Sequence, residues 1–168
     1  IRWDIRPSPR LGTVEQRVCD GVPTLEEVTA IAALTQCLVE DLSTRLDNGE
    51  EIPTMPPWHV QENKWRAARY GMDAIVILNA AGDEKLVTES LVELLNQLEP
   101  TARKLRCENE LAGVETILRY GASYQRQRAV AREHNGSLKA VVASLIAEMR
   151  EGIAKDEPAQ QGGQYNRQ

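Results

Sequence analysis

Phenylalanine is absent from this 168-residue sequence, and all aromatic residues together make up only 4% of it. The hydrophobic core must therefore be built from Leu, Val, Ile and Ala, and the length suffices for one ordinary domain. No hydrophobic run comes near the ~20 residues that a membrane-spanning helix needs. No stretch has the pattern of a signal peptide either. The sequence therefore predicts a cytoplasmic protein that has no membrane partner.

Cysteine and histidine are also scarce. Cys19, Cys37 and Cys107 are odd in number and lack C-x-x-C spacing, which favours free thiols in a reducing compartment over a disulfide framework or a zinc site. His59 and His134 have no partner at metal-ligand spacing, so each is interpreted as a surface residue. The net charge is −5 and the basic residues are scattered, which argues against a nucleic-acid partner.

Two strand-like segments, residues 3–8 and 13–20, open the chain. Because side chains alternate along a strand, Glu15 and Arg17 share one face of the second segment, and Arg6 of the first can join them. A phosphate or metal site uses such a set of charges, but composition alone favours a surface salt-bridge ladder. Two or three strands do not make a stable sheet. Since the chain also opens on Ile1 rather than Met, we expect a longer polypeptide to supply further strands.

The rest of the chain is predicted to be mainly helical. Thr24 and Glu27 have the spacing of a capping box, which predicts the start of a long helix ending at Asn48-Gly49. A second helix is expected over about residues 58–69, and a short hairpin over residues 74–87. Five further helices are predicted: residues 88–98, a short helix that begins at Pro100, residues 109–121, residues 123–135, and a last helix from Ser137.

Two helical segments carry a high density of charge. In residues 62–71, Glu62, Arg66 and Arg69 fall close together on a helix. An exposed helix with a weak ion pair and a functional segment are about equally good interpretations. For residues 124–128, which contain Arg126 and Arg128, a solvated helix face is favoured over a functional site.

In their order and spacing, these segments resemble the type 2 glutamate–cysteine ligase family of carboxylate–amine ligases. The likeness is carried by residues 3–8, 12–20, 22–24 and 62–71, and more weakly by 110–113, 126–128 and 140–142. It covers nearly the whole chain but corresponds to the C-terminal part of such an enzyme, a little under half. The resemblance implies an α+β, glutamine-synthetase-like catalytic fold, with residues 1–152 as part of one catalytic domain and residues 153–168 as a disordered tail.

The resemblance also implies roles for individual residues. Glu15 is the candidate ligand of a divalent metal, Mg²⁺ or Mn²⁺. Arg17 is the catalytic candidate for phosphate or acyl phosphate, and Arg6 the catalytic candidate for a substrate carboxylate or phosphate. The basic residues of the 62–71 segment either bind the ATP cofactor or buttress the sheet: Lys64, Arg66 and Arg69.

The activity implied is ATP-dependent formation of an amide bond, between the γ-carboxylate of L-glutamate and L-cysteine, through an acyl phosphate, as in glutathione biosynthesis. We expect the N-terminal part of the same enzyme as a partner, a homo-oligomer, and no activity in the isolated fragment. One alternative is a non-catalytic helical scaffold or binding module derived from the ligase fold. Another is a ligase for a different acid and amine.

Overall fold

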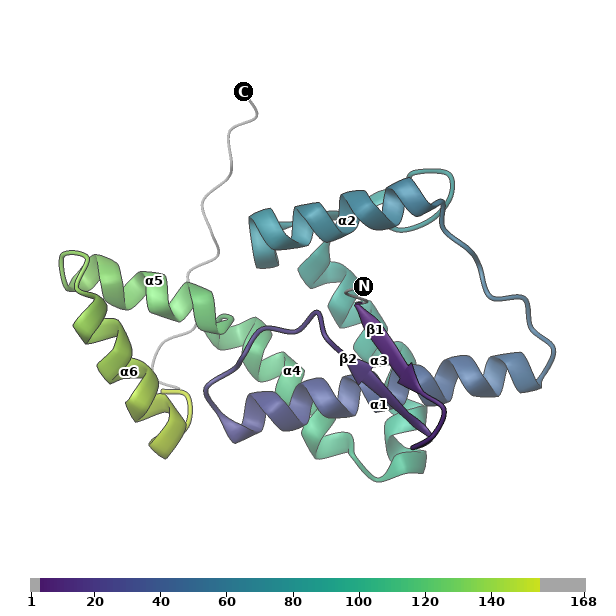
Figure 1. Cartoon of the computed structure of the whole chain (residues 1–168), viewed down its shortest axis with the longest axis horizontal. Coiled ribbons are helices and arrows are strands. Elements are labelled where there is room, and N and C mark those ends of the chain that lie inside the picture. Colours follow the sequence, from purple (N-terminus) through teal and green to yellow (C-terminus); the bar gives the residue numbers. More distant parts are fainter. Residues whose placement is uncertain (1–3, 155–168) are drawn as a thin grey trace.

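The computed structural model describes residues 4–154. Within them the chain is mostly helical, with a few short antiparallel strands (Figure 1), which confirms the predicted α+β class. The elements follow in the order β1 (Ile5–Ser8), β2 (Thr13–Gln16), α1 (Leu25–Asp47), α2 (Pro57–Tyr70), the 3-10 turn η1 (Gly71–Asp73), β3 (Ile75–Ile77), β4 (Glu84–Leu86), α3 (Val87–Leu105), α4 (Glu108–Tyr120), α5 (Ser123–Glu133) and α6 (Leu138–Glu151).

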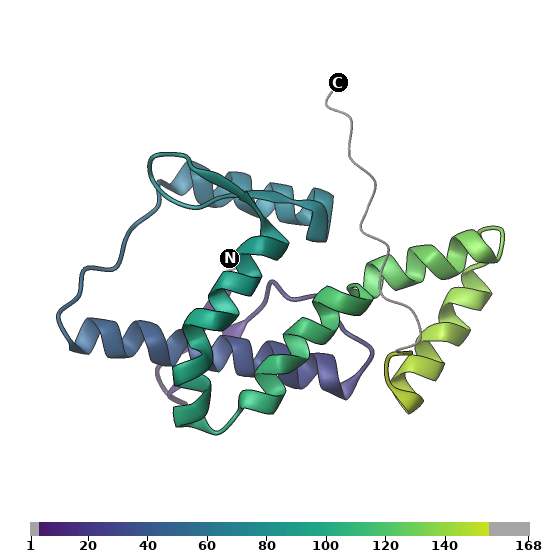
Figure 2. The same ribbon diagram turned by 180° about the vertical axis from the view of Figure 1, so that it is seen from behind.

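The hydrophobic core lies where α1 packs against α3 and α4 (Figures 1 and 2). As the absence of Phe predicts, it is made of small and aliphatic side chains: Ala30, Ala33, Cys37, Leu95, Leu98, Ala102, Leu111 and Val114. The helices α1 and α4 approach closely at Gly113, where an added Cβ would lie 2.9 Å from the Cβ of Ala30. Glycine at this position therefore sets the distance between the two helices.

The long helix α1 begins as predicted. The Thr24 hydroxyl accepts a hydrogen bond from the Glu27 N–H at 3.1 Å, and the Glu27 carboxylate accepts one from the Thr24 hydroxyl at 3.0 Å. Both residues are buried, with Glu27 only 1% exposed. The capping box therefore also brings a carboxylate into the interior.

The predicted break at Pro100 is wrong. The structure has one helix, α3, in place of a helix over 88–98 and a second beginning at Pro100. Pro100 lies on the exposed side, while Leu98 before it and Ala102 after it are buried in the core. Packing on both sides of the proline outweighs the one backbone hydrogen bond that it cannot make.

Between α1 and α3 the chain makes an excursion, residues 48–86, that contains α2 and the predicted hairpin of β3 and β4. The Asn63 amide of α2 donates to the Ile77 carbonyl at 2.8 Å and accepts from the Ile77 N–H at 2.7 Å, so it fixes α2 on β3. Gly71 ends α2 with φ 57°, and a Cβ there would overlap with the Tyr124 hydroxyl. That hydroxyl accepts from the Met72 N–H at 2.9 Å, which joins the excursion to α5.

The helices α5 and α6 form a helical hairpin at one end of the molecule (Figure 1). Ser137 is the N-cap of α6, at the predicted start of the last helix, and Ala122 is the N-cap of α5. Ile153, the first residue of the predicted tail, is 6% exposed, and residues 155–168 of that tail lie outside the described residues. Across residues 4–154 we find no helix that combines the length and the hydrophobicity needed to cross a membrane.

Candidate functional site

The β1–β2 hairpin carries a charged face. Its register places Arg6 directly opposite Glu15, and the guanidinium of Arg6 forms an ion pair with that carboxylate. Arg17 follows β2, where its N–H donates to the Asp4 carbonyl at 2.8 Å, and its Nε lies 3.6 Å from Glu15 Oε1. The structure thus brings the three residues predicted from the hairpin into one cluster, Arg6, Glu15 and Arg17.

The cluster is open to solvent. The side chains of Arg6, Glu15 and Arg17 are 58%, 46% and 38% exposed. Ion pairs at such exposure contribute only about 0–1 kcal/mol to stability. The geometry is that of the salt-bridge ladder that composition favoured, and it also presents two guanidinium groups on either side of a carboxylate to an approaching ligand.

The opposite face of the hairpin is apolar and thinly covered. Ile5 and Val14 are 58% and 59% exposed. One anchor to the core helices is the Thr35 hydroxyl of α1, which donates to Gln16 Oε1 at 2.6 Å. In residues 4–154, β1 and β2 form a sheet of their own with no third strand. Unpaired strand edges and an exposed apolar face are typical of a sheet that is completed by other strands.

The three basic residues predicted in α2 differ in their surroundings. Lys64 Nζ donates to both Asp4 carboxylate oxygens, at 2.6 and 2.8 Å, so it contacts the strand that carries Arg6. Arg69 lies over the Tyr70 ring, with 5.9 Å between its Cζ and the ring centroid. The Lys64 ammonium group therefore ties α2 to the segment that leads into β1.

Arg66 makes contacts typical of a buttress. Its Nε donates to Glu62 at 2.8 Å, and its Nη1 donates to Glu84 at 2.7 Å and to the Ile75 carbonyl at 3.0 Å. Hydrogen bonds to Glu62 and then Glu84 raise the pKa of Arg66. These contacts connect α2 with the β3–β4 hairpin and correspond to the buttressing alternative that the sequence left open.

The fit to a metal ion is partial. Glu15 supplies a carboxylate, the ligand type that Mg²⁺ prefers, but two arginines flank it. In the described part of the chain no three His, Cys, Asp or Glu side chains are grouped to hold a metal. His134 is exposed and His59 half-buried. A complete metal site would therefore need carboxylates from outside residues 4–154.

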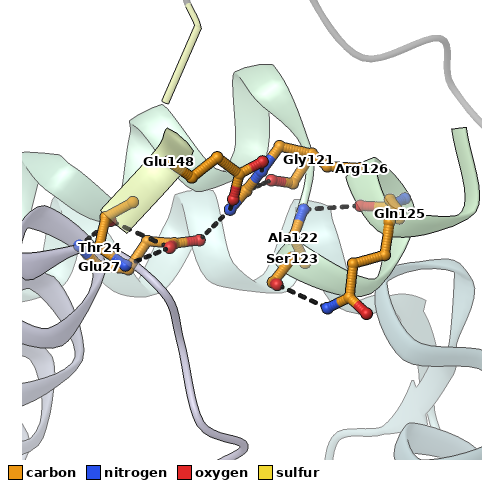
Figure 3. A network of polar contacts seen from close by, with 9 residues as sticks. Thr24, Glu27, Gly121, Ala122, Ser123, Gln125, Arg126 and Glu148 are labelled. Carbon is orange, nitrogen blue, oxygen red and sulfur yellow. Dashed lines mark hydrogen bonds and ion pairs between the residues drawn. The ribbon is translucent and has the colours of Figure 1, made fainter. Parts of the chain in front are cut away.

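The interpretation of residues 124–128 as a solvated helix face is wrong for Arg126. Its side chain is only 12% exposed and lies between two carboxylates (Figure 3). It donates to Glu27 at 2.9 Å, to the two oxygens of Glu148 at 3.0 Å each, and to the Gly121 carbonyl at 2.5 Å. This network joins α1, α5 and α6. The signal in the sequence was Glu27, a carboxylate on the same helical stripe as buried Ala30, which requires a buried cation as partner.

Comparison with known proteins identifies the class as a ligase family. The sequence profile described as glutamate-cysteine ligase family 2 (GCS2) matches residues 1–144. The chain belongs to this family, which confirms the resemblance drawn from its residues.

Curated relatives agree with the profile. A protein of Arthrobacter sp. (strain FB24), provisionally named glutamate–cysteine ligase 2-1, is 68% identical over 152 residues, 90% of this chain and 40% of its own length. A protein of Paenarthrobacter aurescens (strain TC1) with the provisional name glutamate–cysteine ligase 2-2 is 67% identical over the same shares. One of Mycobacterium tuberculosis (strain ATCC 25177 / H37Ra), provisionally glutamate–cysteine ligase 2, is 62% identical over 89% of this chain. The chain spans about two fifths of the length of these relatives.

Proposed function

We propose that this chain is part of an ATP-dependent carboxylate–amine ligase that joins the γ-carboxylate of L-glutamate to L-cysteine. The observation that carries the proposal is the cluster of Arg6, Glu15 and Arg17 on the open face of the hairpin, in a chain of the glutamate-cysteine ligase family 2. The names of the relatives support the choice of acid and amine.

The chemistry requires such a cluster. A carboxylate does not react with an amine at neutral pH, because it has no good leaving group. Phosphorylation by ATP gives an acyl phosphate, which the amine attacks with loss of phosphate. Arg17 and Arg6 would hold the phosphoryl group or the substrate carboxylate through their forked donors and offset its negative charge. Glu15 would be one ligand of the Mg²⁺ or Mn²⁺ that neutralises charge on the phosphates when bound.

We further propose that sequence outside residues 4–154 supplies strands beside β1 and β2 and the remaining metal ligands. The exposed side chains of Ile5 and Val14 and the two unpaired strand edges support this. On this proposal the isolated chain is inactive, and the complete enzyme is a homo-oligomer in the cytoplasm. Lys64 and Arg69 remain proposed ATP contacts, and Arg66 acts by holding α2 in place.

The rival is a non-catalytic scaffold that retains the ligase fold. A scaffold would cover the Glu15 face with apolar side chains, whereas Glu15 is 46% exposed and its neighbours on that face are charged. This observation favours the enzyme. A ligase for a different acid and amine remains the second candidate within the enzyme class. The phosphate-release assay described below distinguishes it from a glutamate–cysteine ligase.

The test measures phosphate release by the complete purified protein with ATP and Mg²⁺ across a panel of amino acids and amines. We expect release with L-glutamate and L-cysteine together, and loss of turnover in Glu15→Ala and Arg17→Ala without loss of helical signal. Arg10→Ala is the matched control, because Arg10 is an exposed arginine of the same hairpin. Release with another pair would identify a different ligase. No release with any pair would remove the ligase proposal, and normal turnover of Glu15→Ala would remove the site.

A further inference from the structure

Two of the three cysteines lie side by side in the core, far from the charged cluster in sequence. Cys37 is in the middle of α1, and Cys107 is the residue before α4, 70 positions further along. Their sulfur atoms are 3.6 Å apart. The odd count and wide spacing of the cysteines, which indicated unrelated free thiols, did not predict this pairing.

The backbone holds both cysteines firmly. Cys37 is fully buried among core side chains. Cys107 lies in the tight turn between α3 and α4, after Arg106 with φ 58°. Its N–H donates to the Ala102 carbonyl at 3.0 Å, and its carbonyl accepts from the Leu111 N–H at 2.9 Å. The short sulfur–sulfur distance is therefore set by a buried position of α1 and by the hydrogen-bonded turn between α3 and α4 that packs against the core.

We propose that Cys37 and Cys107 are a site of covalent modification, which low-molecular-weight disulfides oxidise to an intramolecular disulfide. A disulfide bond is about 2.05 Å long, so the sulfur atoms must approach by roughly 1.5 Å, within the reach of side-chain rotation. This inference does not depend on the proposed ligase activity.

The two thiols have different parts in the reaction. Cys107 is partly exposed and meets the oxidant first. Burial, together with the hydrogen bond to Cys107, raises the pKa of the Cys37 thiol to about 11, which makes Cys37 the slower, second nucleophile.

The exchange balances in two steps. The Cys107 thiol loses its proton and attacks the small disulfide RSSR, whose S–S bond breaks to release RS⁻ and leave a mixed disulfide on Cys107. The Cys37 thiol then loses its proton and attacks the Cys107 sulfur, releasing a second RS⁻. The two protons convert both leaving groups to RSH. The two cysteines are oxidised by two electrons, and RSSR is reduced by the same two.

The new bond closes a ring that contains the whole excursion of residues 48–86, including α2 with Lys64. It joins the middle of α1 to the α3–α4 turn, which follows the end of α3 remote from that excursion. A cross-link over so many residues restricts the unfolded chain strongly, so the oxidised protein is expected to melt about 5–10 °C higher than the reduced protein.

The test treats the complete native protein with oxidised glutathione, blocks remaining thiols with iodoacetamide after denaturation, and maps the links by mass spectrometry. Digestion with trypsin and a glutamyl endopeptidase separates Cys19 from Cys37, because Glu26 and Glu27 lie between them. We expect a link between residues 28–40 and the peptide that begins at Cys107, two hydrogen atoms lighter than the sum of the two thiol peptides. The melting temperature should rise with the same time course.

Three variants make the test specific. Cys37→Ala should leave glutathione on Cys107, Cys107→Ala should leave Cys37 reduced, and Cys19→Ala, the matched control at an exposed cysteine, should keep the link. If Cys37→Ala does not fold, the wild type, Cys107→Ala and Cys19→Ala still show whether the disulfide between Cys37 and Cys107 forms. Alkylation of both Cys37 and Cys107 after oxidation would overturn the proposal. So would a stable glutathione adduct on Cys107 of the wild type, or a link of either residue to Cys19.

Discussion

Replacement of Arg126 by alanine should loosen the α5–α6 hairpin more than any surface substitution. The variant would leave Glu27, 1% exposed, and Glu148, 14% exposed, facing each other without their shared cation. Removing one partner of a buried ion pair costs about 3–5 kcal/mol. The Gly121 carbonyl also loses a donor.

Hydrogen exchange measures this cost in the complete protein without requiring two-state unfolding. If α5 and α6 open together, 3–5 kcal/mol corresponds to amide exchange faster by a factor of about 10² or more in both helices. Arg132→Ala is the matched control, since Arg132 is an exposed arginine of the same helix, and its exchange rates should stay within a factor of about 2–3 of the wild type. Glu148→Gln should have a smaller effect than Arg126→Ala, because an amide oxygen still accepts from Arg126.

The pH dependence sharpens the test. Burial alone would lower the pKa of Arg126, but hydrogen bonds to Glu148 and then Glu27 outweigh it and the net shift is upward. Because the pKa of Arg126 is higher in the folded protein than in the unfolded chain, its ion pairs stabilise the fold fully at any pH below the unfolded value. This stabilisation is lost only as pH rises through the higher folded value. The wild-type contribution should therefore be constant between pH 5 and 9. Amide exchange in Arg126→Ala that stays within tenfold of the wild type at pH 7 would refute the reasoning.

Three other substitutions test the packing and the surface charges. Gly113→Ala should cost about 1–3 kcal/mol in urea unfolding, because its Cβ would lie 2.9 Å from that of Ala30 in the α1–α4 contact; an unchanged midpoint would contradict this contact. Asn63→Ala should cost about 2 kcal/mol and expose the backbone N–H of β3 to hydrogen exchange, because it removes both side-chain bonds to that strand. The hydrogen bond from Lys104 lowers the pKa of Glu40, so this pair stabilises the fold above the ordinary carboxyl pKa and less as pH falls through the lowered value. Lys104→Ala should raise the Glu40 pKa toward its ordinary value in an NMR titration, and an unchanged value would show that the pair does not form in solution.

Local features of the fold were predictable from the sequence. The capping box of Thr24 and Glu27 involves residues three positions apart, so its spacing alone defines it. The alternation of strand side chains likewise placed Glu15 and Arg17 on one face, and the hairpin register then added Arg6. In each case the physical cause acts over a few residues.

Features that depend on distant partners were not predictable in the same way. Arg126 donates hydrogen bonds to Glu27, 99 positions away, and to Glu148, 22 positions away. The sequence of α5 by itself therefore predicts a solvent-exposed helix face. Pro100 stays inside a helix because packing against other helices continues past it. The one local indication was Glu27, a carboxylate on the buried face of α1. It predicts a buried cation as its partner but does not identify that cation.

The charges around Glu15 limit the role that this hairpin has by itself. Arg6, Glu15 and Arg17 carry a net charge of about +1, which attracts phosphate and repels a divalent cation. For Glu15 to bind Mg²⁺, further carboxylates must come close enough to offset the two arginines. Asp4 does not serve this purpose, since Lys64 already occupies both of its oxygens. On the proposed function, the hairpin would therefore be the phosphate side of the site, and Glu15 would become a metal ligand only if sequence from outside residues 4–154 brought the other carboxylates.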